Sequence, residues 1–167
     1  MYIFQDFKGV NKLNLIGRLL IGSSSRAVFI FRLSSWCYQH KLKVLSKFFW
    51  YLNILLHSCD ISPAADIGSD FFMYHTVGVV IGAITAGTCL RVFQNVTVGE
   101  NNFSKVIPKI GNNVTLYAGS VVVGEITIGN DVMVGANSVV LKNLPNNCTA
   151  VGVPCRVIEN KNKQVVL

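Results

Sequence analysis

The side chain best suited to catalysis in this chain is a histidine in a segment that otherwise holds little reactive chemistry. Residues 58–157 contain one histidine, His75, and Asp60 lies fifteen residues before it. Histidine titrates near neutral pH, so a positioned imidazole can take a proton from a hydroxyl nucleophile, and a carboxylate can orient that ring. These residue types are suited to general-base catalysis. The alternatives are a structural histidine satisfied by backbone groups and a turn or capping role for Asp60.

The cysteines and histidines do not form a metal-binding pattern. The five cysteines are an odd number and include no C-x-x-C pair, so we expect reduced thiols in a cytoplasmic protein and neither disulfides nor a zinc site. A single histidine in residues 58–157 is also too few for a three-histidine zinc site. The longest apolar run, Phe48–Leu56, is interrupted by Asn53. It is much shorter than the roughly twenty residues of a bilayer span, so we expect no membrane crossing.

An aliphatic residue recurs every six positions through the second half of the chain. The members of this series are Ile110, Leu116, Val122, Ile128, Val134 and Val140. Neither an α-helix nor an ordinary strand has this period. A coil that turns a corner after each short strand and points one aliphatic inward per side does have it. The same spacing is found earlier, at Ile61, Ile67, Met73, Val79, Val92 and Val98. We therefore expect residues 58–157 to form stacked β-coils.

The six-residue period fails at two places. It slips around Ile84–Leu90, and residues 100–109 cannot be fitted to it. We therefore expect 100–109 to be a loop extruded from the coil. Loops on a rigid scaffold are where functional residues collect. Residues 158–167 are expected to form a short, frayed tail.

Residues 1–57 form a separate, basic segment. They hold eight basic side chains and one acidic one, and the rest of the chain has equal numbers of each, so the whole net charge of +7 lies here. The apolar pattern predicts helices over Arg26–Gln39, with N-cap candidates at Ser23–Ser25, and over about Leu42–His57. No nucleic-acid motif accompanies the basic residues, so we expect no nucleic-acid partner.

Two interpretations of this segment stay open. Its apolar faces could pack on the repeat region or on a neighbouring subunit. The segment could also contact an anionic membrane surface peripherally, where each nearby Lys or Arg contributes about 1 kcal/mol. The two interpretations are compatible.

Six motifs, in order along the chain, resemble those of the hexapeptide-repeat acetyltransferases. They are Asp60–Gly68 (DISPAADIG), Tyr74–Gly78 (YHTVG), Gln94–Gly99 (QNVTVG), Pro108–Gly111 (PKIG), Val139–Pro145 (VVLKNLP) and Val151–Arg156 (VGVPCR). The match covers about residues 58–158 and is most similar to the serine acetyltransferase branch. The helical N-terminus and the small size look more like the branch that O-acetylates bacterial surface polysaccharides of the colanic-acid, O-antigen and capsule type.

The resemblance implies a mainly β fold, a left-handed parallel β-helix preceded by a small α-helical segment. It also implies a homotrimer with active sites between neighbouring subunits, and acetyl-coenzyme A lying in a groove between coils. His75 aligns with the family's catalytic base and Asp60 with the carboxylate that orients it. In such a site the imidazole takes the acceptor's proton as its oxygen attacks the thioester, and then protonates the leaving thiolate. Backbone N–H groups stabilise the oxyanion, and no metal is required.

The resemblance also implies where the coenzyme lies. Small residues at Ala118, Gly119 and Ala136 let its pantetheine arm approach the backbone. Lys142 and Arg156 are candidates for binding its phosphates, the alternative for both being solvated surface charge.

The acceptor site departs from the serine acetyltransferase pattern. Val106 and Ile107 stand where the family has an Arg-His pair that holds the amino acid, and Tyr74 stands where it has an aspartate. These changes remove partners for a carboxylate and an ammonium, whereas a neutral sugar could stack on Tyr74 or Phe103. The sequence therefore favours an O-acetyltransferase acting on a sugar hydroxyl of a surface polysaccharide or its precursor, at the cytoplasmic membrane face.

Three other functions remain as alternatives. The first is serine O-acetylation in cysteine biosynthesis, and the second is N-acetylation of an amino-sugar nucleotide. The third is a non-catalytic trimeric scaffold, against which the Asp60 and His75 pair argues. The sequence does not separate a trimer from a hexamer.

Overall fold

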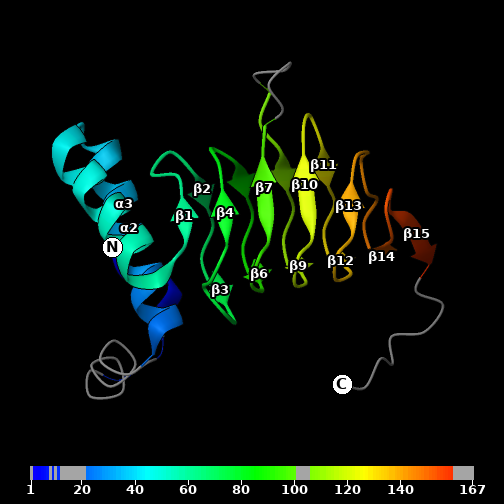
Figure 1. Ribbon diagram of the computed structural model, residues 1–167, viewed down its shortest axis with the longest axis horizontal. Coiled ribbons are helices and arrows are strands. Elements are labelled where there is room, and N and C mark those ends of the chain that lie inside the picture. Colours follow the sequence, from blue (N-terminus) through cyan, green and yellow to red (C-terminus); the bar gives the residue numbers. More distant parts are fainter. Residues whose placement is uncertain (1, 8, 10, 12–21, 101–105, 160–167) are drawn as a thin grey trace.

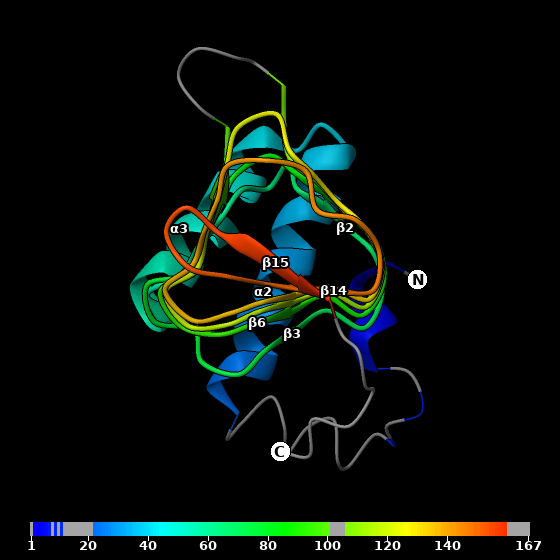
Figure 2. The ribbon, with the colours of Figure 1, turned by 90° about the vertical axis from the view of Figure 1, so that its right-hand side faces the viewer.

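Residues 60–100 and 106–159 wind into a left-handed parallel β-helix, with two α-helices at its N-terminal end (Figure 1). The computed structural model describes residues 2–7, 9, 11, 22–100 and 106–159. The view along the coil shows a triangular outline with the successive turns stacked on one another (Figure 2). The predicted fold class is confirmed.

The described strands form three sheets, one along each side of the triangle. Sheet A contains β1 (Asp60–Ile61), β4 (Val80–Ile81), β7 (Thr97–Gly99), β10 (Val121–Val123) and β13 (Val139–Val140). Sheet B contains β2 (Asp66–Ile67), β5 (Thr85–Ala86), β8 (Lys109–Ile110) and β11 (Thr127–Ile128). Sheet C contains β3 (Phe72–Met73), β6 (Arg91–Val92), β9 (Thr115–Leu116), β12 (Met133–Val134), β14 (Cys148–Val151) and β15 (Arg156–Glu159).

The six-residue aliphatic series fills the interior of the coil, as the sequence predicts. All six residues from Ile110 to Val140 in that series are buried. A second row of aliphatics, two positions earlier on several sides, is buried with them, as at Val114, Ile126 and Val132. Burying side chains of this size stabilises the fold by about 1.5–3 kcal/mol each, so the periodic positions supply most of the core.

The C-terminal end of the coil is closed by a strand where the sequence predicts the start of a frayed tail. β15 pairs antiparallel with β14, Val151 opposite Arg156 and Thr149 opposite Ile158. This hairpin supplies backbone partners to the last strand of sheet C, which would otherwise be an unpaired edge. Residues 160–167 and half of the predicted loop, residues 101–105, lie outside the described residues.

The N-terminal segment contains η1 (Tyr2–Phe7), α2 (Ser23–Gln39) and α3 (Lys43–His57). The N-cap of α2 is Gly22, which has no side chain, and the three serines predicted as caps lie in the first helical turn instead. Helix α2 covers the open end of the first coil. Its Phe31 ring meets the edge of Phe71 with centroids 6.0 Å apart, and Ala27, Val28 and Phe31 share one buried cluster with the coil interior.

A buried arginine ties η1, α2 and the first coil together. Arg32 Nε and Nη2 donate to the two carboxylate oxygens of Asp6, at 2.6 and 2.9 Å, and both side chains are almost fully buried. Its Nη1 and Nη2 also donate to the carbonyl oxygens of Ile67 and Gly68, both at 2.6 Å. Asp6 in turn accepts from the Phe71 N–H at 2.8 Å. The guanidinium is thus paired and hydrogen-bonded, as a buried charge must be.

Replacing Asp6 by Asn should destabilise the protein strongly, because the amide keeps the shape of the carboxylate but leaves the Arg32 charge buried and unpaired. We expect the free energy of unfolding to fall by about 3–5 kcal/mol, measured by urea denaturation. Asp66→Asn, at an exposed side chain of β2, is the control and should change it by less than about 0.5 kcal/mol. Equal values for the two variants would show that the ion pair does not hold the helices on the coil.

Candidate active site

The turns that lead from sheet C to sheet A form one column along the coil, here called the C–A corner. They comprise residues 74–79, 93–96, 117–120 and 135–138. Successive turns are joined by backbone hydrogen bonds, from Asn95 N–H to Val77 O at 3.0 Å, from Gly119 N–H to Gln94 O at 3.0 Å, and from Asn137 N–H to Ala118 O at 2.9 Å. The corner therefore places His75 in line with Ala118, Gly119 and Ala136. All four residues are among those that the sequence predicts for the site.

The turn that carries His75 is longer than the turns stacked on it. The inward residues Met73 and Ile81 are eight positions apart, whereas Val92 and Val98, the next pair at this corner, are six apart. The two extra residues bulge the chain outward, and the His75 side chain is exposed. Val79 is buried as well, which explains why the six-residue pattern seems unbroken here. An imidazole held outside the coil can meet a substrate from solvent.

Asp60 flanks the same corner and is held by the N-terminal helices. Helix α3 ends at His57, Ser58 adopts a left-handed conformation, and β1 begins at Asp60. Trp50 Nε1 of α3 donates to Asp60 Oδ1 at 2.7 Å. Among the described residues no hydrogen bond joins Asp60 to His75, and Oδ2 of the carboxylate takes part in none. That oxygen stays available to an imidazole, and its role in orienting His75 stays a prediction.

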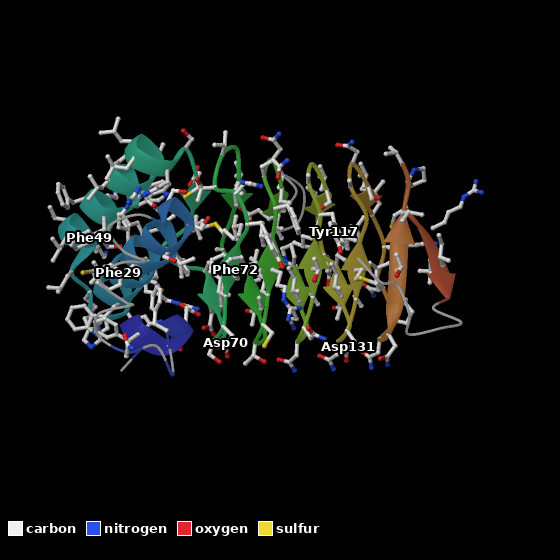
Figure 3. The ribbon with its side chains drawn as sticks, turned by 90° about the horizontal axis from the view of Figure 1, so that it is seen from below. Phe29, Phe49, Asp70, Phe72, Tyr117 and Asp131 are labelled. Carbon is white, nitrogen blue, oxygen red and sulfur yellow. The ribbon has the colours of Figure 1, made fainter. Side chains whose placement is uncertain are left out.

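A stack of aromatic rings runs beside the C–A corner along sheet C. The Tyr74 and Phe93 rings are 4.2 Å apart and nearly parallel, and Phe93 and Tyr117 are 5.0 Å apart. Phe72 meets Tyr74 edge-on at 5.0 Å, and Figure 3 shows Phe72 and Tyr117 on the same face of the coil. Tyr74 was predicted to contact the acceptor. Phe93 and Tyr117 were missed, although each directly follows an inward residue just as Tyr74 does.

The remaining predicted residues lie at different distances from this corner. Arg156, exposed at the start of β15, lies opposite Val151 at the C-terminal end of the C–A column. Lys142 is exposed after β13, on the turn that leads from sheet A to the next side of the coil, so one chain does not bring it to the column. Phe103 lies outside the described residues. Coenzyme binding by Lys142 and Arg156 therefore stays a prediction.

Two buried oxygen atoms at the C–A corner have no hydrogen-bond partner among the described residues. They are Gln94 Oε1 and Ser120 Oγ, which belong to the second and third turns of the column. A buried polar atom without a partner costs about 1–3 kcal/mol, and such atoms are uncommon in native proteins. Both atoms are buried within the single chain, so a ligand on the outer side of the corner does not reach them.

The cysteine beside Asp60 cannot serve as a nucleophile. Burial raises the pKa of the Cys59 thiol to about 12, with a smaller contribution from the Asp60 carboxylate. The thiolate is the reactive form, so Cys59 is inert near neutral pH and does not support a covalent acetyl-enzyme. Among the described residues, no group of three or more His, Cys, Asp or Glu side chains is placed to hold a metal ion.

The sequence of this chain is similar to those of known acetyltransferases. Residues 107–142 match the family model described as bacterial transferase hexapeptide (six repeats). A serine acetyltransferase of Synechococcus elongatus is 40% identical over 151 residues, covering 88% of this chain and 62% of that protein. A serine acetyltransferase of Bacillus pumilus is 35% identical over 150 residues, covering 88% of this chain and 69% of that protein. The chain thus spans less than two thirds of the Synechococcus relative.

Solved structures agree with the sequence comparison. A serine acetyltransferase in complex with CoA superposes with a TM-score of 0.82 at 28% identity, covering 93% of this chain and 68% of that chain. A soybean serine acetyltransferase complexed with serine has a TM-score of 0.83 at 28% identity, covering 94% of this chain and 68% of that chain.

The prediction of a polysaccharide acceptor is wrong, because these curated relatives are serine acetyltransferases. That prediction rested on three positions, Val106, Ile107 and Tyr74, where groups suited to an amino acid are replaced. The similarity to the serine enzymes extends over 88% of the chain, so it outweighs substitutions at three sites. The same relatives support the alternative function, serine O-acetylation.

We expect thiol labelling to separate Cys59 from Cys89. With iodoacetamide at pH 8, Cys89, the one cysteine that is partly exposed among the described residues, should be modified first. Cys59 should stay unmodified in the folded protein because burial keeps its pKa high. Mass spectrometry of digested samples gives the order of labelling, and labelling in urea is the control in which all five cysteines react. If Cys59 were modified as fast as Cys89 in the folded protein, Cys59 would not be the buried, unreactive thiol described above.

Proposed function

Because the chain belongs to the serine acetyltransferase family of hexapeptide-repeat transferases, we propose that it transfers the acetyl group of acetyl-coenzyme A to the hydroxyl of L-serine. The observation that carries the proposal is the 40% identity to a serine acetyltransferase over 88% of the chain. The exposed His75 on a lengthened turn, in line with small residues of two successive coils, supplies a base and a path for the coenzyme.

His75 is the proposed general base. Its imidazole takes the proton of the serine hydroxyl as that oxygen attacks the thioester carbonyl. The tetrahedral intermediate collapses with loss of the coenzyme A thiolate, which the imidazolium then protonates. The acetyl group passes directly between substrates, consistent with the inert Cys59 thiol beside the site. A positioned base of this kind contributes about 10²–10⁴-fold to the rate.

Asp60 is the proposed positioning residue for His75, and Trp50 holds Asp60. A carboxylate that accepts from the ring N–H fixes the imidazole tautomer and stabilises the imidazolium that forms. The hydrogen bond from Trp50 Nε1 fixes one oxygen of this carboxylate, leaving the other to face the ring. Helix α3 is thereby part of the site, although it contributes no atom to the reaction.

Acetyl-coenzyme A is the proposed co-substrate, with its pantetheine arm along the C–A corner. Ala118, Gly119 and Ala136 have little or no side chain, so the arm can reach backbone groups there. Arg156 lies at the far end of the column, where its guanidinium can bind a phosphate.

The acceptor must be held differently from the way the family pattern suggests. Val106 is exposed and Ile107 half-buried, and neither can pair with the carboxylate of serine. The Tyr74 hydroxyl can still accept a hydrogen bond from the serine ammonium, but without the charge of an aspartate. We therefore infer a weak Michaelis complex with serine.

We also infer a homotrimer with active sites between subunits, in the cytoplasm. The C–A corner of a single chain is open to solvent on its outer side, with Tyr74, His75 and Val77 all exposed. A neighbouring coil packed beside it would exclude water from the reacting thioester, which strengthens electrostatic stabilisation of the intermediate. The five cysteines are free, as in a reducing compartment.

Release of coenzyme A from acetyl-coenzyme A should depend on L-serine and on His75. We expect His75→Ala to lower the serine-dependent rate by about 10²–10⁴-fold, while the thermal unfolding midpoint stays nearly unchanged because the side chain is exposed. His40→Ala, at an exposed histidine between α2 and α3, is the matched control and should retain activity. Absence of any serine-dependent release would overturn the assignment of serine as the acceptor. Full activity of His75→Ala would overturn the assignment of His75 as the general base.

Restoring the family's pair of side chains should tighten serine binding. The double variant Val106→Arg/Ile107→His supplies a guanidinium for the serine carboxylate. A charge-assisted hydrogen bond contributes about 1.5–3 kcal/mol, so we expect KM for serine to fall by about tenfold or more. The kcat should change little, because the added contact is made equally in the ground state and the transition state. Steady-state kinetics with Val106→Leu/Ile107→Leu as control decides this, and an unchanged KM would show that serine is bound elsewhere.

A further inference from the structure

Helix α3 has its polar and apolar sides reversed relative to an ordinary surface helix. Figure 1 shows α2 and α3 at the N-terminal end of the coil. A helix in this position normally buries an apolar stripe and exposes a polar one. In α3, two stripes have the same helical spacing of four, three and four residues. The inward stripe is Ser46, Trp50, Asn53 and His57, and the outward stripe is Val44, Phe48, Tyr51 and Leu55.

The inward stripe is polar because it makes specific hydrogen bonds to α2 and β1. Ser46 and Ser34 exchange hydroxyl-to-carbonyl hydrogen bonds at 2.9 and 2.8 Å. Asn53 Nδ2 donates to the Ala27 carbonyl oxygen at 3.1 Å, and its Oδ1 lies 3.0 Å from His57 Nδ1. These bonds fix the rotation of α3 about its axis. The outward direction of the apolar stripe is therefore set by the structure.

The outward stripe exposes large side chains along the length of the helix. Val44 is 86% exposed, Phe48 57%, Tyr51 62% and Leu55 80%. Leu45 and Leu56 extend the same face. At its N-terminal end, Val44, Leu45 and Phe48 line a surface hollow of about 620 Å³ together with residues 41–43. Contiguous exposed apolar surface of this kind marks an interaction site.

The charge around this stripe is entirely positive. Lys41, Lys43 and Lys47 are exposed at the N-terminal end of α3, and residues 22–57 contain no acidic side chain. Cations at a helix N-terminus oppose the helix dipole, and α3 has neither an acidic residue in its first turn nor a side-chain cap. Lys41 and Lys43, at the start of the helix, therefore cost helix stability, which an anionic surface held against them would offset.

We propose that the outward face of α3 docks on an anionic lipid bilayer surface, with the apolar stripe at the level of the headgroups and the lysines on lipid phosphates. Each lysine near such a surface contributes about fivefold to binding, and aromatic and aliphatic side chains on one helical face are typical of interfacial helices. A second copy of this chain is a poorer partner, because residues 22–57 offer no carboxylate to pair with its lysines. The proposal is independent of the acetyl acceptor.

No described helix is long and apolar enough to span a bilayer, so the contact is peripheral. It should therefore be reversible and sensitive to ionic strength, since headgroup charges are screened by salt. Because Trp50 of the same helix holds Asp60, a docked α3 would place the C–A corner at a fixed distance from the lipid surface.

Flotation of the full chain with vesicles tests the proposal. We expect binding to vesicles of phosphatidylglycerol and phosphatidylcholine, and little binding to phosphatidylcholine alone. Lys43→Gln/Lys47→Gln should lower the partition coefficient by about tenfold or more. The matched control is Lys109→Gln/Lys142→Gln, which removes two exposed lysines of the β-helix and should leave binding unchanged. Phe48→Ser/Leu55→Ser should weaken binding further, and circular dichroism verifies that each variant is folded.

Three results would overturn the proposal. The first is equal flotation with both vesicle types, and the second is equal loss of binding in the two lysine double variants. The third is an absence of lipid binding together with a concentration-dependent rise in mass that Phe48→Ser/Leu55→Ser abolishes in sedimentation. That outcome would assign the face to a second copy of the chain.

Discussion

Backbone hydrogen bonds between successive coils run in register along the β-helix, from the pairing of Asp60 with Val80 to that of Val121 with Val139. This register converts a linear repeat into columns, because residues at equivalent positions of successive coils lie above one another. The aliphatic columns fill the interior. The C–A corner is a column of the same kind on the outside, and it brings His75 and Ala136, which are 61 positions apart in sequence, onto one line.

The N-terminal helices act on this column from one end. Arg32 fastens α2 to Ile67 and Gly68 of the first coil, and the polar stripe of α3 fastens α3 to α2. Trp50 is then fixed over Asp60, which links the helical segment to the proposed catalytic pair. The apolar face of α3 is left outward by the same contacts. One rigid arrangement thus sets both the carboxylate geometry and the surface available to a partner.

Much of the fold could be predicted from the sequence because its period is imposed by packing. The inward positions from Ile110 to Val140 follow from spacing alone, whereas the grouping of His75 with the small residues of later coils came from the resemblance to the acetyltransferase family. The lengthened turn at His75 could not be found, because Val79 is buried two positions before the inward Ile81 and keeps the apparent period intact. The Trp50 donor was also hidden, since the rotation of α3 depends on contacts between Ser34, Ser46 and Asn53 that no local pattern encodes. The acceptor was mispredicted because substitutions at Val106 and Ile107 were given more weight than similarity over the whole repeat region.

Acetyl transfer at the C–A corner is tested most directly by a crystal structure of the protein with coenzyme A. We expect the pantetheine arm along Ala118, Gly119 and Ala136, with the thiol sulfur within reach of the His75 imidazole. Coenzyme A bound along another corner of the triangle, or with its sulfur remote from His75, would contradict it.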